Sequence, residues 1–172
     1  LERWVHEESV SFRASERRGT VTKAEPFASY RMLLSQLLPP GGRALKIVVD
    51  CGNGMAGAYE YLILKDRFPK ITGMYVEPDG TFPNHAANPL VEKNLDDLRR
   101  RVVETGADAG LAFDGDGDRV AFVDELGRTV SGDLLLALMA PVTLARSPGA
   151  AVLYDLRCSW AVREEIERAG GK

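Results

Sequence analysis

Three aspartates at alternate positions are the residues of this sequence best suited to chemistry. Asp114, Asp116 and Asp118 are separated only by glycines, follow an apolar run typical of a strand, and precede Arg119. Like charges this close repel, and strands disfavour Asp, so packing alone does not explain the pattern. A hard divalent cation takes oxygen ligands, and glycines let the backbone turn alternate side chains toward one point. The residues therefore predict a metal loop, and Arg119 indicates that the metal acts on a phosphate group.

The same stretch partly matches an EF-hand calcium loop. Counted from Asp114, the first, third and fifth positions are aspartates and the twelfth is Glu125. The sixth position, which requires glycine for a sharp turn, is Arg119. The flanking residues have the pattern of strands, whereas an EF-hand loop is flanked by helices. We therefore set the EF-hand interpretation aside.

A second alternative is a phosphatase with an aspartate nucleophile, in which a strand ends in Asp-x-Asp beside Mg²⁺. Phe113-Asp114-Gly115-Asp116 fits that pattern, with one carboxylate attacking phosphorus and the other moving a proton. Asp118 stands where that class of phosphatase has Thr or Val. No acidic pair later in the sequence completes the metal site of such an enzyme. This alternative stays open at the level of sequence.

A third alternative concerns another turn, which contains a literal G-x-G-x-x-G from Gly52 to Gly57. It lies between a predicted strand and a predicted helix, and Glu77 ends the next strand, as a dinucleotide site requires. However, Asp50 enters the turn and would face the pyrophosphate, and Glu77 lies beyond the usual spacing of about 20 residues. The other interpretation is that the glycines only permit a tight turn and close packing.

Strand and helix patterns alternate along the chain and must position these motifs. The expected strands are Leu45–Val49, Ile71–Val76, Ala109–Phe113, Val120–Asp124 and Ala151–Tyr154. The expected helices are Glu25–Leu38, Met55–Leu64, Lys93–Glu104, Asp133–Ala145 and Ser159–Ala169. The alternation predicts a layered α/β domain with a mixed or largely parallel sheet and flanking helices, plus the start of a second similar domain. Residues 1–23 have no clear periodicity, and residues 39–42 read as a linker.

Composition limits the class of protein and its partners. The 172 residues are 45% hydrophobic and 27% charged, with a net charge of −3, so nothing favours binding to nucleic acid. The longest apolar helix candidate, Leu134 to Leu144, is too short to span a bilayer, so we expect no membrane partner. Cys51 and Cys158 do not suggest a disulfide framework, which favours a cytoplasmic location. A polar start without Met suggests a fragment of a longer protein.

Taken together, the motifs resemble the α-D-phosphohexomutases, the family of bacterial phosphomannomutases and phosphoglucomutases. The matching stretches run in order along most of the chain from residue 45: Asp50 to Gly57, Glu77 to His85, Asn88-Pro89, Asn94-Leu95, Phe113 to Arg119, and Asp155 to Ser159. The resemblance implies that residues 1–42 end a preceding domain with its linker. Residues 43–132 would form the metal-binding second domain, and residues 133–172 would begin a third domain that is cut short.

The resemblance also implies an activity and roles for residues. Asp114, Asp116 and Asp118 would hold Mg²⁺ together with a phosphoserine oxygen from the family's first domain. The whole protein would interconvert the 1- and 6-phosphates of a hexose, either mannose or glucose. Arg119 would act in catalysis by binding a phosphoryl oxygen, and Arg157 would bind substrate where relatives often have Lys.

Parts of the family's catalytic apparatus have no counterpart in this sequence. The serine loop, the loop that reads the sugar and the C-terminal phosphate-binding loop are not found. We therefore expect the chain to be inactive alone. His85 is expected to support its loop and not to act as a catalyst.

Overall fold

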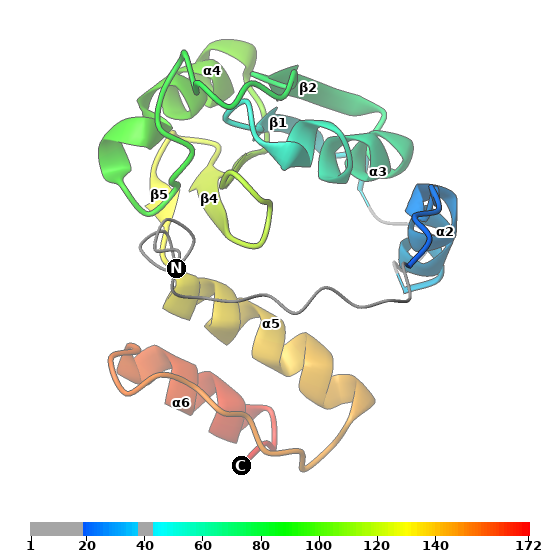
Figure 1. Ribbon diagram of the computed structural model, residues 1–172. Helices are drawn as coiled ribbons and strands as arrows, with labels where there is room; N and C mark the ends of the chain where they lie inside the picture. The colour runs from blue at the N-terminus through cyan, green and yellow to red at the C-terminus, as the bar shows by residue number, and fades with distance from the viewer. Residues whose placement is uncertain (1–18, 38–42) are drawn as a thin grey trace, which may run out of the picture.

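A five-stranded mixed sheet is built from strands that lie between Lys46 and Val130 (Figure 1). The computed structural model describes residues 19–37 and 43–172. The strands are β1 (Lys46–Asp50), β2 (Lys70–Met74), β3 (Ala109–Phe113), β4 (Val120–Asp124) and β5 (Thr129–Val130). Their order is β2-β1-β3-β4-β5, in which β2, β1 and β3 are parallel, β4 is antiparallel to β3, and β5 is antiparallel to β4. The expected mixed α/β sheet domain is confirmed.

Helices connect the parallel strands and cover both faces of the sheet. The helical segments are α2 (Phe27–Leu37), η1 (Met55–Gly57), α3 (Glu60–Arg67), η2 (Glu92–Leu95), α4 (Asp96–Thr105), α5 (Gly132–Arg146) and α6 (Trp160–Arg168). The first crossover, from β1 to β2, contains α3, and the second, from β2 to β3, contains α4. None of the helices in the described ranges combines the length and the apolar character that crossing a bilayer requires.

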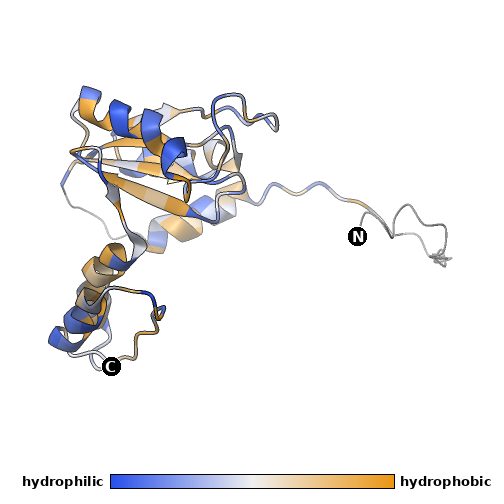
Figure 2. Cartoon of the chain, turned by 90° about the vertical axis from the view of Figure 1, so that its left-hand side faces the viewer, coloured by the Kyte–Doolittle hydropathy of each residue, from blue (hydrophilic) through white to orange (hydrophobic). Residues whose placement is uncertain are grey.

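Strand β1 is buried on both faces because it lies between two other strands and between the two helical layers. On one face, Val48 packs with Leu98 and Val102 of α4. On the other face, Ile47 and Val49 belong to a cluster that includes residues of α3. The strands accordingly carry the hydrophobic colour in Figure 2. A strand with an apolar interior and helices on both faces is typical of parallel sheets.

Helices α5 and α6 form a separate hydrophobic core. Ala137, Ala140 and Leu144 of α5 pack against Val162 and Ile166 of α6. This pair of helices lies beyond β5, apart from the layers of the sheet (Figure 1).

Three predicted elements differ from the structure. The single helix expected over Lys93–Glu104 is divided into η2 and α4, which ends at Thr105. The continuous helix expected over Met55–Leu64 is instead η1 followed by α3, which runs to Arg67. The break follows a close approach at Gly57, where an added Cβ would lie 1.8 Å from the Val76 carbonyl oxygen. No strand forms over Ala151–Tyr154. Val152 N–H donates to the Lys172 carbonyl (2.8 Å), and Lys172 N–H donates to the Ala150 carbonyl (3.0 Å), but no strand of the described residues pairs with this segment.

The other predicted elements lie close to their expected bounds. The strands over Ala109–Phe113 and Val120–Asp124 match residue for residue. The short strand β5 was not predicted. The helix expected to reach Leu38 is described to Leu37, and the predicted linker at 39–42 and most of the irregular stretch at 1–23 lie outside the described residues.

Candidate metal centre and its supporting turn

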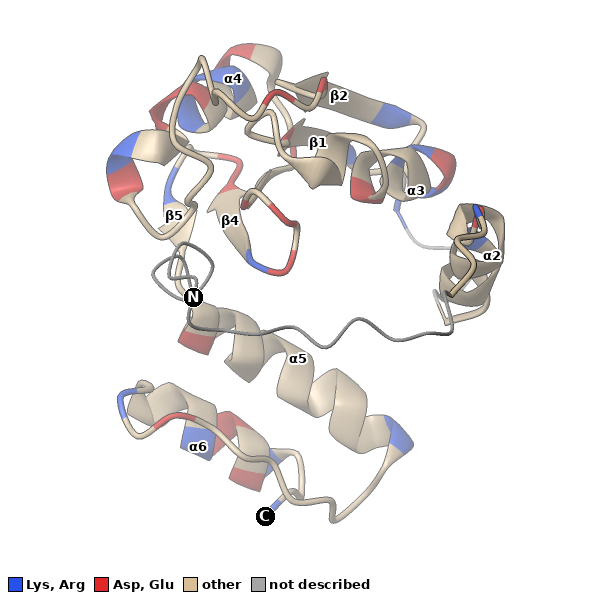
Figure 3. Cartoon of the chain, in the orientation of Figure 1, with Lys and Arg blue, Asp and Glu red and all other residues tan. Residues whose placement is uncertain are grey.

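The aspartate loop (residues 114–119) lies at the edge of the sheet where the parallel strands end. It joins β3 to β4, and Phe113 at the end of β3 pairs with Val120 at the start of β4. Asp50, the last residue of β1, pairs with Ala112 of β3, so the ends of β1 and β3 lie side by side. The carboxyl ends of parallel strands are where α/β sheets bind ligands. Figure 3 shows acidic and basic residues together on this loop beside β4.

The structure brings the three predicted metal ligands together. One carboxylate oxygen from each of Asp114, Asp116 and Asp118 lies within 4.8 Å of the others. Asp114 is buried, and the other two are exposed. The negative charges of Asp116 and Asp114 raise the pKa of the Asp118 carboxyl above its usual value. Three clustered carboxylates fit a hard cation such as Mg²⁺, which binds oxygen ligands and offsets this repulsion.

Arg119 neutralises the buried member of the cluster. Its Nε lies 2.7 Å from Asp114 Oδ2, and its backbone N–H donates to Asp114 Oδ1 at 3.1 Å. Burial alone would raise the pKa of Asp114, but these hydrogen bonds and the nearby guanidinium outweigh it and hold the pKa below its usual value. The Arg119 side chain is 49% exposed. The guanidinium is therefore attached to the site yet accessible to an anion in solvent.

The same contacts bear on the phosphatase alternative. Both oxygens of Asp114 accept hydrogen bonds from Arg119, and its side chain is 1% exposed. A carboxylate that attacks phosphorus needs a free oxygen facing the substrate, and a metal ligand likewise needs a free lone pair, so these contacts do not separate the two roles. No observation at the loop favours Asp114 as a nucleophile over Asp114 as a ligand.

The G-x-G-x-x-G turn supports the aspartate loop. The Met55 N–H donates to the Gly115 carbonyl at 2.9 Å. A Cβ at Gly54 would lie 2.7 Å from that same carbonyl oxygen, so the two loops touch backbone to backbone. Glycine at this position is therefore explained by close packing of the turn on the metal loop.

The backbone amides of this turn are not available for a pyrophosphate. Gly52 N–H donates to Asp50 Oδ1 at 2.8 Å, and Asn53 N–H donates to the Tyr75 carbonyl at 2.8 Å. Gly54 N–H donates to Cys51 at 2.7 Å. A dinucleotide site instead presents free amides to its phosphates. The structure thus favours the interpretation of the turn as scaffold.

Arg157, the remaining predicted site residue, lies in the other unit of the chain. It sits between α5 and α6, and its Nε and Nη2 contact the two oxygens of Asp155 at 2.9 and 3.0 Å. The structure therefore does not bring Arg157 to the aspartate loop.

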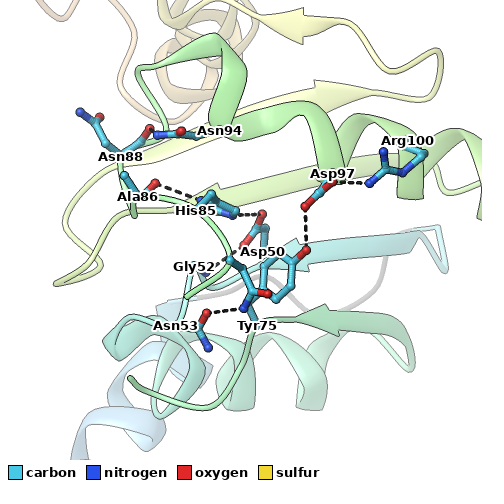
Figure 4. Close-up of polar contacts among 11 residues, drawn as sticks. Asp50, Gly52, Asn53, Tyr75, His85, Ala86, Asn88, Asn94, Asp97 and Arg100 are labelled. Atoms are coloured by element: carbon cyan, nitrogen blue, oxygen red, sulfur yellow. Dashed lines mark hydrogen bonds and ion pairs between the residues drawn. The ribbon is translucent and has the colours of Figure 1, made fainter. Parts of the chain in front are cut away.

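Sequence reasoning did not identify the polar network on the other side of the turn, shown in Figure 4. Asp50 is fully buried and accepts from His85 Nε2 at 2.9 Å. Tyr75 donates its hydroxyl to Asp97 at 2.7 Å, and its ring meets the His85 imidazole edge to face. The available signal was an Asp that ends an apolar strand, because a carboxylate buried there requires a partner.

Comparisons with known proteins agree with this architecture. Residues 34–127 match the family model described as phosphoglucomutase/phosphomannomutase, alpha/beta/alpha domain II. A curated phosphomannomutase/phosphoglucomutase of Pseudomonas putida is 45% identical over 130 residues, which is 76% of this chain and 28% of the relative. A phosphoglucomutase of Neisseria meningitidis serogroup B is 35% identical over 165 residues, 96% of this chain and 36% of the relative.

A solved structure from Burkholderia thailandensis, described as a phosphoglucomutase/phosphomannomutase family protein, superimposes with a TM-score of 0.80 at 34% identity. The match covers 86% of this chain and 32% of the neighbour. The chain thus spans about a third of the length of the proteins it matches.

Proposed function

Because this chain belongs to the phosphoglucomutase/phosphomannomutase family, we propose that the whole protein interconverts the 1- and 6-phosphates of a hexose, with mannose or glucose phosphate as substrate. The observation that carries the proposal is the cluster of Asp114, Asp116 and Asp118 at the carboxyl edge of the sheet, with Arg119 attached to it. The named relatives over 76% and 96% of the chain support it.

Asp114, Asp116 and Asp118 would hold Mg²⁺, with a phosphoserine oxygen from a preceding domain as a further ligand. The ion would supply positive charge that offsets the negative charge developing during phosphoryl transfer. The chain's own contribution is to gather three carboxylates on a short loop, which the turn at Gly54 and Met55 holds from behind.

Arg119 would bind and orient the phosphoryl group as a catalytic residue. Its guanidinium is planar and presents several N–H donors, which suits the geometry of phosphate oxygens. Arg157 would contact the substrate from the third domain. Because Asp155 engages it through two hydrogen bonds, it would have to exchange that partner for the substrate.

The proposed division of the chain follows the same assignment. Residues 1–42 would end the preceding domain, residues 43–132 would form the metal-binding domain, and residues 133–172 would begin the next. The phosphorylated serine and the sugar-reading loop would come from outside this sequence, so the isolated chain would be inactive. The whole protein would be a cytoplasmic phosphoprotein of carbohydrate metabolism.

Titration of the chain with Mg²⁺ by isothermal calorimetry tests the metal site. Asp116→Asn removes one ligand charge from an exposed position and should weaken binding by about tenfold or more. Glu125→Gln, which removes one exposed charge in the turn after β4, is the matched control and should bind like the unaltered chain. Equal Mg²⁺ affinity in both variants would show that the loop is not the metal site. In the whole protein, a phosphoryl group trapped on Asp114 would instead support the phosphatase.

A further inference from the structure

We propose that His85 is a positioning residue for the metal site, which it serves by fixing the covering loop (residues 75–88) onto the aspartate loop through Asp50. This inference rests on the proposed function only in treating the aspartate loop as a metal site. The covering loop leaves the end of β2 and passes over the turn that follows β1.

Asp50 is the fixed point of this arrangement. Its side chain is fully buried at the end of the central strand β1. One carboxylate oxygen accepts from Gly52 N–H at 2.8 Å, and the other accepts from His85 Nε2 at 2.9 Å. The same carboxylate therefore holds both the turn and the covering loop. A buried carboxylate with an ionic partner destabilises its surroundings when that partner is removed.

His85 has an acceptor at each ring nitrogen. Nε2 faces Asp50, and Nδ1 lies 3.0 Å from the Ala86 carbonyl oxygen. A neutral imidazole has one N–H and can satisfy only one of these acceptors, whereas the imidazolium satisfies both. The hydrogen bond to Asp50 raises the pKa of His85 to about 9. The side chain is only 15% exposed, so solvent does little to replace a lost contact.

The charged and titratable groups around His85 favour its protonated form. Asp50 contacts it directly, and Asp97 adds a favourable charge from α4. Tyr75 packs against the ring, and its hydrogen bond to Asp97 raises its own pKa to about 12. Burial raises the pKa of the neighbouring Cys51 thiol to about 12. Tyr75 and Cys51 thus keep their protons over the range in which His85 titrates.

The covering loop lies next to Gly115, the residue between two of the metal ligands. A Cβ at Gly115 would lie 3.5 Å from the ring of Phe82 and 3.8 Å from Ala87 Cβ, which is ordinary contact distance. The covering loop lies closer to Gly52, where an added Cβ would be 3.2 Å from Ala87 Cβ. We therefore expect movement of the covering loop to alter the surroundings of Gly115 and with them the spacing of Asp114 and Asp116.

The covering loop is held in a demanding conformation. Within it, Tyr75 and Phe82 have positive φ angles of 50° and 49°, and Asn53, in the turn that the loop covers, has one of 56°. Residues other than glycine keep such angles only where their surroundings determine them strongly. Asn53 supplies part of that restraint, because its Nδ2 donates to the Glu77 carbonyl at 2.9 Å and its Oδ1 accepts from Asn84 at 2.7 Å. The His85–Asp50 contact restrains the far end of the same loop.

The experiment compares His85→Gln with Tyr75→Phe in the full chain. Glutamine can donate to Asp50 but carries no positive charge, whereas Tyr75→Phe removes only the hydroxyl bond to Asp97 and leaves Asp50 paired. By calorimetry at pH 7.5, His85→Gln should weaken Mg²⁺ binding by about tenfold, as is typical for residues that orient metal ligands from outside the site. Tyr75→Phe should change it less than about twofold.

The pH profile separates positioning from a merely structural role. The Mg²⁺ affinity of the unaltered chain should fall as pH rises through about 9, whereas that of His85→Gln should stay level. Carboxylate ligands, already ionised, give no such fall. An equal affinity and the same profile in His85→Gln and the unaltered chain would overturn the inference.

Hydrogen exchange in metal-free chain keeps this test separate from the proposed function. The amides of Met55 and Gly117, which hold the aspartate loop, should exchange faster in His85→Gln than in Tyr75→Phe or the unaltered chain. Equal exchange rates in all three would refute the positioning role, whether or not Mg²⁺ binds. If the exchange rates differ as expected but the unaltered chain does not bind Mg²⁺, the result would count against the proposed function alone.

Discussion

Replacing Gly57 by alanine should destabilise the sheet domain strongly, although alanine is small and the position is near the surface of the turn. The added Cβ would lie 1.8 Å from the Val76 carbonyl oxygen. Real Cβ contacts are essentially never shorter than 3.0 Å, so the backbone after β1 and the backbone after β2 must separate by about 1.2 Å, the difference between these distances. Forced overpacking of this kind costs about 3 kcal/mol, at the upper end of the usual range.

Two other glycines make a graded series with Gly57. At Gly54, the Cβ would lie 2.7 Å from the Gly115 carbonyl oxygen, and Gly54→Ala should cost about 1–2 kcal/mol. At Gly132, the first residue of α5, nothing lies within 4 Å. Gly132→Ala should be neutral or stabilise the chain by about 0.4–1 kcal/mol, because it restricts the unfolded chain without strain.

Amide hydrogen exchange of the β1 residues measures the opening free energy of the sheet domain in each variant. The expected order of stability is Gly132→Ala, then Gly54→Ala, then Gly57→Ala. If Gly57→Ala left β1 as protected as Gly132→Ala does, the close approach to Val76 would not be a restraint. The turn would then need an explanation other than packing.

Three further predictions test the core, a cap and a titration. Leu98→Ala truncates a fully buried side chain of α4 and should lower the free energy of urea unfolding by about 2–5 kcal/mol. Leu126→Ala, at a side chain that is 61% exposed, should change it by no more than about 0.5 kcal/mol. Similar losses in the two variants would contradict the assigned core. Ser159→Ala removes the hydroxyl that accepts a hydrogen bond from the Ala161 N–H at the start of α6. The loss should destabilise the helix by about 1 kcal/mol, measured by hydrogen exchange of the α6 amides. Unchanged exchange would mean that this cap does not stabilise the helix. Because the pKa of His85 rises from 6.5 to about 9 on folding, its stabilising contribution is complete below pH 6.5 and is lost as pH rises through 9. Each pKa unit is worth about 1.36 kcal/mol, and after allowance for solvent screening we expect the free energy of unfolding to fall by about 1–2 kcal/mol over this pH range. Urea unfolding at several pH values measures the fall, which should be missing in His85→Gln.

The sequence predicted best what depends on neighbouring residues. The strands Ala109–Phe113 and Val120–Asp124 were placed correctly because an apolar run and its turn residues lie together in the chain. The cluster of Asp114, Asp116 and Asp118 was expected for the same reason, since five consecutive residues contain it. Local spacing was enough to predict which side chains meet there, and their ligation of a metal stays a prediction.

Features that depend on distant partners were missed. The break between η1 and α3 depends on the Val76 carbonyl, 19 positions after Gly57 in the sequence. The contact of Asp50 with His85 spans 35 positions, and nothing in either local pattern indicates the other. Ala151–Tyr154 has the composition of a strand, yet a strand requires a hydrogen-bonded partner along its length, and among the described residues its backbone partner is the single residue Lys172.

The two separate hydrophobic cores have a thermodynamic consequence. The cores of the sheet domain and the core of α5 with α6 share no buried residue. Effects of substitutions in one core should add to those in the other, because additivity holds between sites without common partners. A ligand bound at the aspartate loop stabilises only the folded unit that contains it. Heating the chain with Mg²⁺ should therefore shift the melting of the sheet domain and leave that of the helical pair in place, so that a single melting temperature does not describe this molecule.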